Sequence, residues 1–354
     1  MTYDVIVVGA GGIGSAAIAH LAGRGLRVLG IDRFRPPHTY GSTHGGNRLI
    51  RKAYFEDPRY IPLLERSYTL WRELEERSGT RLYFDTGLLV LSDGPHRAQA
   101  VAEEYGIALE VLSAAEVRQR YPAFSVGDGY HGLLEPDAGY LAVEAAVRAH
   151  LQTNAELRFD ERVLSWESLG NHVRVQTDRG RYEAGALVLA PGAWSAELAP
   201  GLDMQLKVTR APQFWFEGAA PGLPCFAFAR GGEFIYGFPD LKICNYAPST
   251  PLADPLAKDP AYTAAELEPV ARAVREFLPG VRPEPVRWNI CMFTLSPDEN
   301  FILDRHPAHA NVFLFAGDSG HAFKFAPVLG ELLADMVAGA KGPAFLAYTP
   351  GGRR

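Results

Sequence analysis

Cysteine is scarce in this sequence, and positive charge is not in excess. Only three cysteines, Cys225, Cys244 and Cys291, occur among 354 residues. Their odd number and wide spacing argue against a disulfide framework and a cysteine zinc site, and we expect no bound metal. The formal net charge of −6 is not that of a protein that binds nucleic acid or an anionic membrane.

Long hydrophobic runs are missing as well. No apolar stretch reaches the roughly 18 residues that a membrane-spanning helix needs. A predicted strand begins at Tyr3, so we expect no signal peptide in front of it and a cytoplasmic location. The chain is long and 47% hydrophobic, which predicts two domains rather than a single core.

The N-terminus has the pattern of a strand, helix, strand unit. Residues 3–8 are rich in valine and isoleucine, as is typical of a buried parallel strand. Residues 9–14 read Gly-Ala-Gly-Gly-Ile-Gly, and a predicted helix follows to about Gly25. Residues 27–32 predict a second strand that ends in an acid. The complete order is much more specific than a glycine motif alone and indicates dinucleotide binding.

Each position in this unit has a physical role. Gly9 permits a tight turn, Gly11 lets the backbone approach a pyrophosphate, and Gly14 lets the helix pack closely on the strand. The pyrophosphate is then bound by free N–H groups at the positive end of the helix. Asp32 is placed to accept hydrogen bonds from ribose hydroxyls. NAD and FAD both use this unit, so the choice between them needs other residues.

Secondary structure farther along the chain is also indicated. Apolar spacing predicts helices over residues 60–77, 144–153 and 263–278. Ser113 begins a capping box that opens a short helix. Residues 206–246 alternate as strands do, with Pro and Gly between them.

Two segments near the C-terminus carry a family resemblance. Residues 289–294 read Asn-Ile-Cys-Met-Phe-Thr around Cys291, and residues 317–324 read Gly-Asp-Ser-Gly-His-Ala-Phe-Lys. With the glycine unit, they resemble the monomeric sarcosine oxidase and N-methyltryptophan oxidase family of D-amino-acid-oxidase-like FAD enzymes. By its surroundings alone, Cys291 is more simply a small core residue. The resemblance implies that its thiol attaches FAD covalently.

The resemblance also implies the fold. We expect an α/β class protein, α+β overall, with a Rossmann-type FAD-binding domain and a substrate domain built on an antiparallel sheet. The FAD-binding domain is expected to be discontinuous and to comprise residues 1–85, 138–203 and 305–354. Residues 86–137 and 204–304 are expected to form the substrate-binding domain.

FAD is favoured over NAD by two features. A long loop follows the second strand, and residues 186–194 form an apolar strand ending in Pro-Gly that resembles the strand returning to the dinucleotide in these flavoproteins. Taken alone, that strand is more simply interpreted as an ordinary core strand. The glycine unit and the resemblance together predict a cofactor site made by Gly9, Gly11, Gly12, Ile13, Gly14, Asp32, Arg33, Ser42, Arg48, Val163, Gly192, Trp194, Cys291, Gly317, Gly320, His321 and Lys324.

Four basic residues are implied at the reaction centre. By the resemblance, His44 and Arg48 lie against the flavin ring, and Arg51 and Lys324 hold the substrate carboxylate. Arginine offers a planar fork to a carboxylate, and lysine adds a point charge. Without the resemblance, solvated surface charge is the simpler interpretation of the two arginines.

A lysine in a predicted hairpin is implied as the group that activates oxygen. The family carries a lysine at the position of Lys242, together with a pocket tyrosine at Tyr236. A three-residue turn over residues 239–241 would pair Tyr236 with Cys244 and place Lys242 on the same face. A two-residue turn would send Tyr236 to the other face.

Three positions depart from the family pattern. Tyr246 replaces a histidine that touches substrate, Ala227 replaces a larger apolar residue, and Asp318 replaces an aromatic residue beside the flavin. Tyr236, which matches the family, Tyr246 and Ala227 are the predicted substrate-site residues besides Arg51 and Lys324, and the three departures concern the choice of substrate rather than the chemistry. A smaller residue at Ala227 favours a side chain larger than that of sarcosine, unless Tyr246 fills the space.

The resulting hypothesis is an FAD-dependent oxidase of secondary amines of amino acids, such as sarcosine or other N-methyl amino acids, that produces hydrogen peroxide. Its partners are a small-molecule amino-acid substrate and O2, and it is expected to be a monomer or small homo-oligomer. The alternatives are a glycine, D-amino-acid or cyclic imino-acid oxidase, a flavin dehydrogenase that passes electrons to a carrier, and a non-catalytic flavin-binding subunit. A scaffold would need only the glycine unit, not the basic residues.

Overall fold

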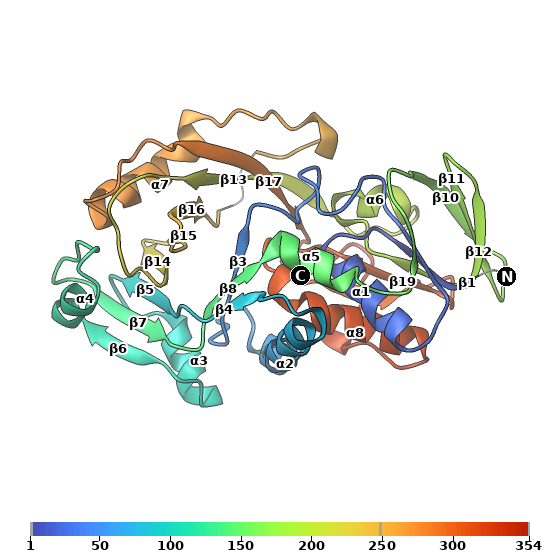
Figure 1. Ribbon diagram of the computed structural model, residues 1–354, viewed down its shortest axis with the longest axis horizontal. Helices are drawn as coiled ribbons and strands as arrows, with labels where there is room; N and C mark the ends of the chain where they lie inside the picture. The colour runs from blue at the N-terminus through green and yellow to red at the C-terminus, as the bar shows by residue number, and fades with distance from the viewer. Residues whose placement is uncertain (1–2, 248–249, 353–354) are drawn as a thin grey trace.

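The computed structural model describes residues 3–247 and 250–352. The chain forms two large sheets joined by a small one, with helices packed on both large sheets (Figure 1). The first sheet has eight strands: β10 (Val163–Ser168), β11 (Val173–Thr177), β12 (Arg181–Leu189), β1 (Tyr3–Val8), β2 (Val28–Ile31), β9 (Glu156–Arg158), β19 (Val312–Ala316) and β18 (Ile302–Arg305).

The N-terminal strand β1 is the centre of the first sheet. It pairs in parallel with β12 on one side and with β2 on the other. Val5 and Val7 pack into the core under the helices, whereas Ile6 and Val8 pack into a second core on the opposite face. Both faces of the strand are thus covered, which explains why its sequence is apolar throughout rather than alternating.

A layer of helices covers one face of this sheet. It is made by α1 (Gly12–Gly23), α2 (Ile61–Ser78), α5 (Val143–His150) and α8 (Ala326–Val337), which lie together in Figure 1. The helix α1 connects β1 to β2, so these three elements form the predicted unit. On the opposite face lies the short helix α6 (Ser195–Leu198), and the antiparallel strands β10 and β11 at the edge of the sheet contribute apolar residues to the same core.

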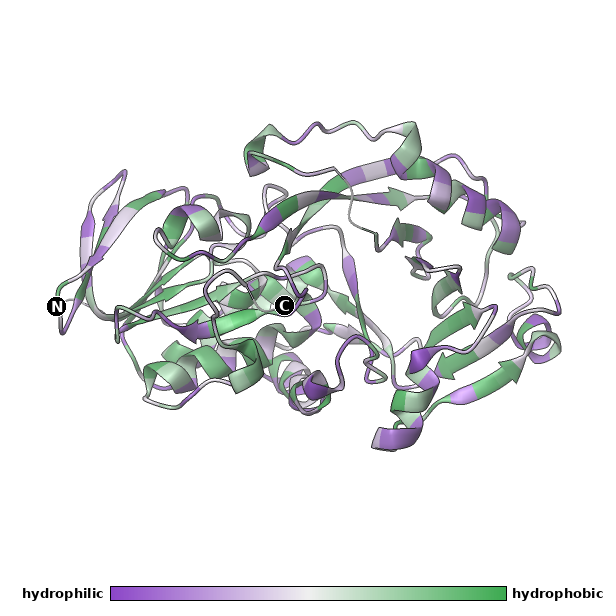
Figure 2. Cartoon of the chain, turned by 180° about the vertical axis from the view of Figure 1, so that it is seen from behind, coloured by the Kyte–Doolittle hydropathy of each residue, from purple (hydrophilic) through white to green (hydrophobic). Residues whose placement is uncertain are grey.

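The second sheet holds most of the middle of the chain. Its eight strands, in order, are β17 (Arg287–Leu295), β13 (Lys207–Trp215), β16 (Lys242–Asn245), β15 (Glu233–Gly237), β14 (Cys225–Arg230), β5 (Leu88–Ser92), β7 (His131–Glu135) and β6 (Glu110–Ser113). The helix α7 (Ala264–Phe277) packs Val270, Val274 and Phe277 on one face of this sheet. Its other side is hydrophilic (Figure 2), as expected for an outer helix.

The remaining elements connect the two large sheets. A three-stranded sheet is formed by β3 (Asn47–Ile50), β8 (Gly139–Ala142) and β4 (Tyr83–Phe84) and lies between them in Figure 1. The helices α3 (Arg97–Tyr105) and α4 (Ala114–Arg120) lie at the edge near β6 and β7. Short 3-10 turns cover Pro58–Tyr60, Gly192–Trp194, Pro255–Ala257, Phe323–Phe325 and Ala344–Leu346.

The mixed α/β class predicted from the sequence is confirmed, and so are several local details. The three helices predicted over residues 60–77, 144–153 and 263–278 correspond to α2, α5 and α7. Ser113 makes the expected capping box at the start of α4. The turn between β15 and β16 has three residues, since Tyr236 pairs with Cys244. Within the described residues, no helix is both long and apolar enough to cross a membrane.

The contact between α1 and α8 provides a test of the fold. A Cβ added at Gly330 would lie only 2.6 Å from the backbone carbon of Ala16. We expect Gly330→Ala to force the two helices apart and to lower the free energy of unfolding by about 1–3 kcal/mol, measured by urea denaturation. Gly23→Ala is the control, because nothing lies within 4 Å of a Cβ there. Equal stability of the two variants would contradict this packing.

Candidate active site

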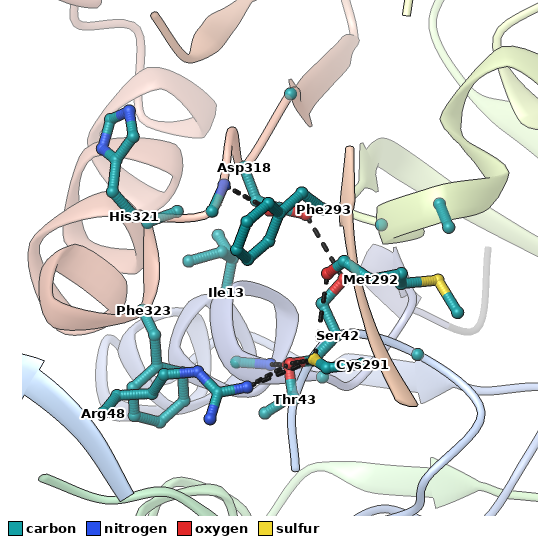
Figure 3. Close-up of a pocket in the computed structure, with 18 of the residues that line it drawn as sticks. Ile13, Ser42, Thr43, Arg48, Cys291, Met292, Phe293, Asp318, His321 and Phe323 are labelled. Atoms are coloured by element: carbon teal, nitrogen blue, oxygen red, sulfur yellow. Dashed lines mark hydrogen bonds between the residues drawn. The ribbon is translucent and has the colours of Figure 1, made fainter. Parts of the chain in front are cut away.

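A cavity of about 530 Å3 opens between the two large sheets. Its walls combine the glycine turn after β1, the long loop after β2, the end of β12, the inner face of β17 and the segment that precedes α8. Figure 3 shows this convergence, with Ser42 and Thr43 from the long loop close to Cys291 of β17. Segments that are far apart in the sequence thus share one cavity.

The glycine turn forms an anion-binding end of this cavity. Gly9 has a φ of 90°, and a Cβ there would collide with the carbonyl oxygen of Ala190. A Cβ at Gly14 would collide with the carbonyl oxygen of Gly9, so both positions require glycine. Gly11 provides no side-chain cap at the N-terminus of α1, and Gly11, Gly12 and Ile13 border the cavity. The N–H of Gly12 donates to the hydroxyl of Thr43 at 3.1 Å. Such a helix end suits a pyrophosphate.

Asp32 at the end of β2 fits the ribose of a dinucleotide. Its carboxylate accepts hydrogen bonds from the backbone N–H groups of Ala10 at 2.7 Å and Phe34 at 2.9 Å. These bonds hold the side chain at the border of the cavity. The carboxylate oxygens retain lone pairs that can accept hydrogen bonds from a ligand. Together with the N-terminus of α1, this carboxylate makes the residues present suitable for FAD.

Cys291 lies on the cavity side of β17. Its Sγ donates a hydrogen bond to the carbonyl oxygen of Ser42 at 3.3 Å and accepts one from the Arg48 guanidinium at 3.4 Å. Arg48 also donates to the carbonyl of Ser42 at 2.9 Å, so the three groups form one cluster (Figure 3). The thiol is therefore fixed on the cavity wall, beside a permanent positive charge.

Asp318 lies near this cluster, in the segment before α8. Its carboxylate accepts a hydrogen bond from the N–H of Gly320 at 3.0 Å and lies 3.4 Å from the hydroxyl of Ser42. Burial raises the pKa of Asp318 to about 6, against the opposing effect of its backbone hydrogen bonds. The position predicted to differ from the family thus places an ionisable carboxyl on the cavity wall.

Arg51 is buried and already paired with a carboxylate of the same chain. Its Nη2 donates to both oxygens of Glu56, at 2.5 and 2.6 Å, and its Nη1 donates to the carbonyl of Ala53. The guanidinium lies 4.2 Å from the ring centre of Phe55. Burial opposes ionisation of Glu56, yet Arg51 and Lys324 hold its pKa below the usual value. A substrate carboxylate would have to share Arg51 with Glu56.

Lys324 is the second buried cation of this region. Its Nζ donates to the carbonyl of His321 at 3.0 Å, and its own carbonyl accepts from Ser67 and Trp71. Burial, reinforced by the nearby Arg51, lowers the pKa of Lys324 to about 7. No carboxylate of the described chain lies within salt-bridge distance of this ammonium. A ligand carboxylate would supply the missing counter-charge.

His321 is fixed by two hydrogen bonds. Its Nε2 lies 2.9 Å from the carbonyl of Glu299, so this nitrogen carries the proton, and its Nδ1 accepts from the hydroxyl of Tyr54 at 2.5 Å. Burial, with Lys324 as the next cause, lowers the pKa of His321 to about 4. The imidazole is therefore neutral at physiological pH and supports the backbone that positions Lys324.

Lys242 lies next to the cavity but does not border it. Its side chain is 1% exposed, and its Nζ donates to the carbonyls of Gly45 and Asn47, each at 2.8 Å. Burial, followed by repulsion from Arg48, lowers the pKa of Lys242 to about 7. Its two carbonyl partners do not border the cavity either, whereas Arg48, the residue after Asn47, does.

Two other predicted residues do not border the cavity. His44 belongs to the long loop after β2, but its side chain is buried outside the cavity. Its Nδ1 pairs with Asn289, and its Nε2 has no partner among the described residues. Burial lowers the pKa of His44 to about 3. Ala227 is fully buried in a cluster with Cys225 and Phe238. The free space that the sequence led us to expect beside Ala227 is therefore absent, because neighbouring apolar side chains fill it.

The other predicted residues border the cavity. Of the predicted cofactor residues, Gly14 alone does not, since it serves the contact of α1 with β1. The cavity is bordered by Gly9, Gly11, Gly12, Ile13, Asp32, Arg33, Ser42, Arg48, Arg51, Val163, Gly192, Trp194, Tyr236, Tyr246, Cys291, Gly317, Gly320, His321 and Lys324. In the described part of the chain, no group of three or more His, Cys, Asp or Glu side chains could hold a metal ion.

Sequence reasoning missed several residues of the site. Glu56, Phe55, His96 and Phe234 all border the cavity. Glu56 could have been suspected, since a carboxylate close to Arg51 in the same loop is a natural partner for a buried arginine. The three rings share no spacing, because Phe55 follows β3, His96 precedes α3 and Phe234 lies in β15, so no pattern in the sequence links them.

Comparisons with known proteins agree with this geometry. The model of the FAD dependent oxidoreductase family matches residues 4–336. The chain is 37% identical to monomeric sarcosine oxidase of Streptomyces avermitilis, over 95% of this chain and 93% of that protein. It is 34% identical to N-methyl-L-tryptophan oxidase of Salmonella dublin, over 96% and 95% of the two chains.

Solved structures give the same result. NikD, described as an unusual amino acid oxidase essential for nikkomycin biosynthesis, superposes with a TM-score of 0.88 at 27% identity and 98% coverage of both chains. Glycine oxidase from Geobacillus kaustophilus superposes with a TM-score of 0.81 at 21% identity, over 98% of both chains, which shows a shared fold. With its glycine turn, its acid at the end of β2 and a family match over nearly its whole length, the chain belongs to the FAD dependent oxidoreductase family and is an enzyme whose cofactor is FAD.

Proposed function

We propose that this enzyme oxidises secondary amines of amino acids, such as sarcosine or other N-methyl amino acids, and transfers the electrons to O2 to form hydrogen peroxide. The observation that carries the proposal is the pair of buried cations, Arg51 and Lys324, in the cavity that also contains the glycine turn and Cys291. Relatives named for sarcosine and for N-methyl-L-tryptophan support this choice of substrate.

The two cations suit the carboxylate of an amino acid. Lys324 has no carboxylate partner within the described chain, and Arg51 has N–H donors beyond those used by Glu56. A bound carboxylate would relieve the repulsion between the two cations. Charge-assisted hydrogen bonds of this kind are stronger than neutral ones and fix the orientation of the ligand.

The same cations favour the reactive form of the amine. Bound FAD supplies the chemistry of accepting a hydride equivalent from the C–N unit of the substrate. The positive charges of Arg51, Lys324 and Arg48 disfavour an ammonium ion in the cavity, so the amine is held neutral. Tyr236 and Tyr246 border the cavity and close it toward the second sheet, which limits water around the amine.

A peroxide-coupled screen tests the proposal. Purified holoenzyme is supplied with N-methyl, cyclic, D- and unsubstituted amino acids. Peroxide formation should be fastest with a secondary amine that carries a carboxylate. A primary D-amino acid or glycine as the best substrate would overturn the assignment. Reduction of the flavin without peroxide would indicate a dehydrogenase instead.

Covalent attachment of FAD at Cys291 is the first prediction. The thiol lies on the cavity wall, where the Arg48 guanidinium and the Ser42 carbonyl fix its position. Acid precipitation of the wild type should leave a yellow pellet, and Cys291→Ser should release the flavin into the supernatant, as measured by absorbance. Cys225→Ser is the control, since Cys225 is buried outside the cavity. A colourless wild-type pellet would contradict the proposal.

The second prediction assigns oxygen activation to Lys242. A buried positive charge close to the cavity stabilises negative charge that develops on O2. Lys242→Met should slow reoxidation of the reduced enzyme by roughly 100–1000-fold, with a much smaller effect on its reduction by substrate. Both steps are measured by stopped-flow absorbance. Lys207→Met, at an exposed lysine of β13, is the control and should change neither step. A reoxidation rate within a few fold of wild type would show the assignment to be wrong.

The third prediction concerns Lys324 and pH. Its pKa of about 7 in the ligand-free protein should rise when a carboxylate binds, because the ammonium gains a counter-charge. Affinity for a simple carboxylate such as acetate should therefore be full below pH 7 and fall above it, by up to about 10-fold per pH unit. The dissociation constant is measured from the change in flavin absorbance.

Lys324→Met provides the matched control. It should weaken carboxylate binding by roughly 10–150-fold, the value of a lost charged hydrogen bond, and should remove the pH dependence. A wild-type affinity that stays constant through this range would contradict the role of Lys324. A variant that retains the wild-type pH dependence would assign the titration to another group.

A further inference from the structure

Beyond Arg51 the cavity continues between two loops of the second sheet. One loop, residues 92–96, connects β5 to α3, and the other is the tip of the β14–β15 hairpin at Gly231 and Gly232. Both loops belong to the second sheet, whereas the glycine turn belongs to the first, and β3, which leads to Arg51, lies between the two sheets in Figure 1. None of the residues proposed above for the reaction comes from either loop.

The wall of this region is a continuous series of rings. Phe55 and His96 lie edge to face with their centres 4.7 Å apart, and Phe234 is 5.9 Å from Phe55. Phe234 is 6.4 Å from Tyr246, which is in turn 6.1 Å from Phe293 beside Cys291. We call Phe55, His96, Phe234 and Tyr246 the aromatic subsite. It begins at the Arg51 guanidinium, which stacks on Phe55.

The rings of the aromatic subsite are only partly covered by the protein. Phe55, His96, Phe234 and Tyr246 are all half-buried, and each borders the cavity. Apolar surface that converges inside a concave site is the usual feature of a ligand pocket. A ligand that covered these rings would remove apolar area from water and could stack edge to face on Phe55 or Phe234.

The subsite is uncharged. Burial, followed by repulsion from Arg51, lowers the pKa of His96, and its Nδ1 accepts a hydrogen bond from the N–H of Ala98. At the hairpin tip, Arg230 and Glu233 are paired with Glu276 and Arg272 of α7. The hairpin therefore presents Phe234 to the cavity rather than an unpaired charge.

We infer that the aromatic subsite binds a large apolar, preferably aromatic, side chain of the substrate whose carboxylate is held by Arg51 and Lys324. This inference rests on the proposed function for the carboxylate end of the ligand. It places the space for a large side chain between the two loops, not beside Ala227. Phe234 is the specificity-determining residue, since it contacts the other rings without touching Arg51.

Binding of two carboxylates to the holoenzyme tests the inference without turnover. The probes are propionate and 3-phenylpropionate, and their dissociation constants are measured from changes in flavin absorbance. Wild type should bind 3-phenylpropionate about 10–100-fold more tightly than propionate, as expected for a phenyl ring in an apolar pocket. Phe234→Ala should reduce this preference by about 10-fold, and Phe234→Leu should keep most of it.

Tyr105→Ala is the matched control, because Tyr105 is an exposed aromatic residue at the end of α3 and does not border the cavity. It should leave the preference unchanged. Absence of a preference in wild type, or its full retention in Phe234→Ala, would overturn the aromatic subsite. Phe234→Leu guards against misfolding, since it keeps an apolar side chain of similar size.

Turnover separates this inference from the proposed function. The ratio of kcat/KM for N-methyl-L-phenylalanine to that for sarcosine should fall in Phe234→Ala in parallel with the binding preference. If sarcosine is oxidised but no preference exists, the subsite is wrong and the oxidase function stands. If the preference exists and depends on Phe234 but no secondary amine is oxidised, the subsite stands and the proposed function is wrong.

Discussion

The structure depends on the burial of several cations in and beside one cavity wall. Arg51, Lys242 and Lys324 are each less than a tenth exposed, and Arg48 lies close to Lys242. Removing a charge from water is costly, so each cation is held by fixed dipoles or by a carboxylate. Lys242 uses two carbonyls, Lys324 uses one, and Arg51 uses Glu56 together with a carbonyl. The remaining cost appears in the lysine pKa values of about 7.

Such an arrangement requires a rigid support. The carbonyls of Gly45 and Asn47 lie at the start of β3, and Lys242 lies at the start of β16, so two different sheets fix the positions of donor and acceptor. Lys324 lies between Trp71 of α2 and the segment carrying His321, whose neutral ring is fixed on both sides. The Lys324 ammonium, which has no carboxylate partner in the described chain, is thereby held where an anionic ligand can bind it. Pre-organised charge of this kind is the common basis of tight and oriented ligand binding.

In our proposal, specificity and charge come from different parts of the molecule. Arg48 and Arg51 lie in and directly after β3, and Lys324 lies in the segment before α8. The aromatic subsite adds His96 from the loop before α3, Phe234 of β15 and Tyr246 after β16 to Phe55, which follows Arg51. Loops vary easily in sequence without disturbing the sheet that supports them. This separation allows the same cations to bind the carboxylate of substrates with different side chains. The residues of the β14–β15 hairpin and of positions 92–96 would then select the side chain.

The sequence by itself determined the local units of this protein. The G-x-G-x-x-G turn, the acid at Asp32 and the capping box at Ser113 depend on neighbours a few positions away, and all three were predictable. The sequence left two lengths open for the turn after Phe238, and strand pairing decided for three residues. Tertiary structure alone decided that Lys242, His44 and Ala227 do not border the cavity, although the predicted cofactor residues other than Gly14 do. Arg48 and Cys291 form a hydrogen bond although they are 243 positions apart. Cys225 and Phe238 pack in one cluster with Ala227 and fill the space beside it. Turns and helices depend on residues at fixed short spacings, so their patterns can be recognised in the sequence. Contacts between segments of different sheets depend on how whole sheets pack, and no residue spacing in the sequence indicates them.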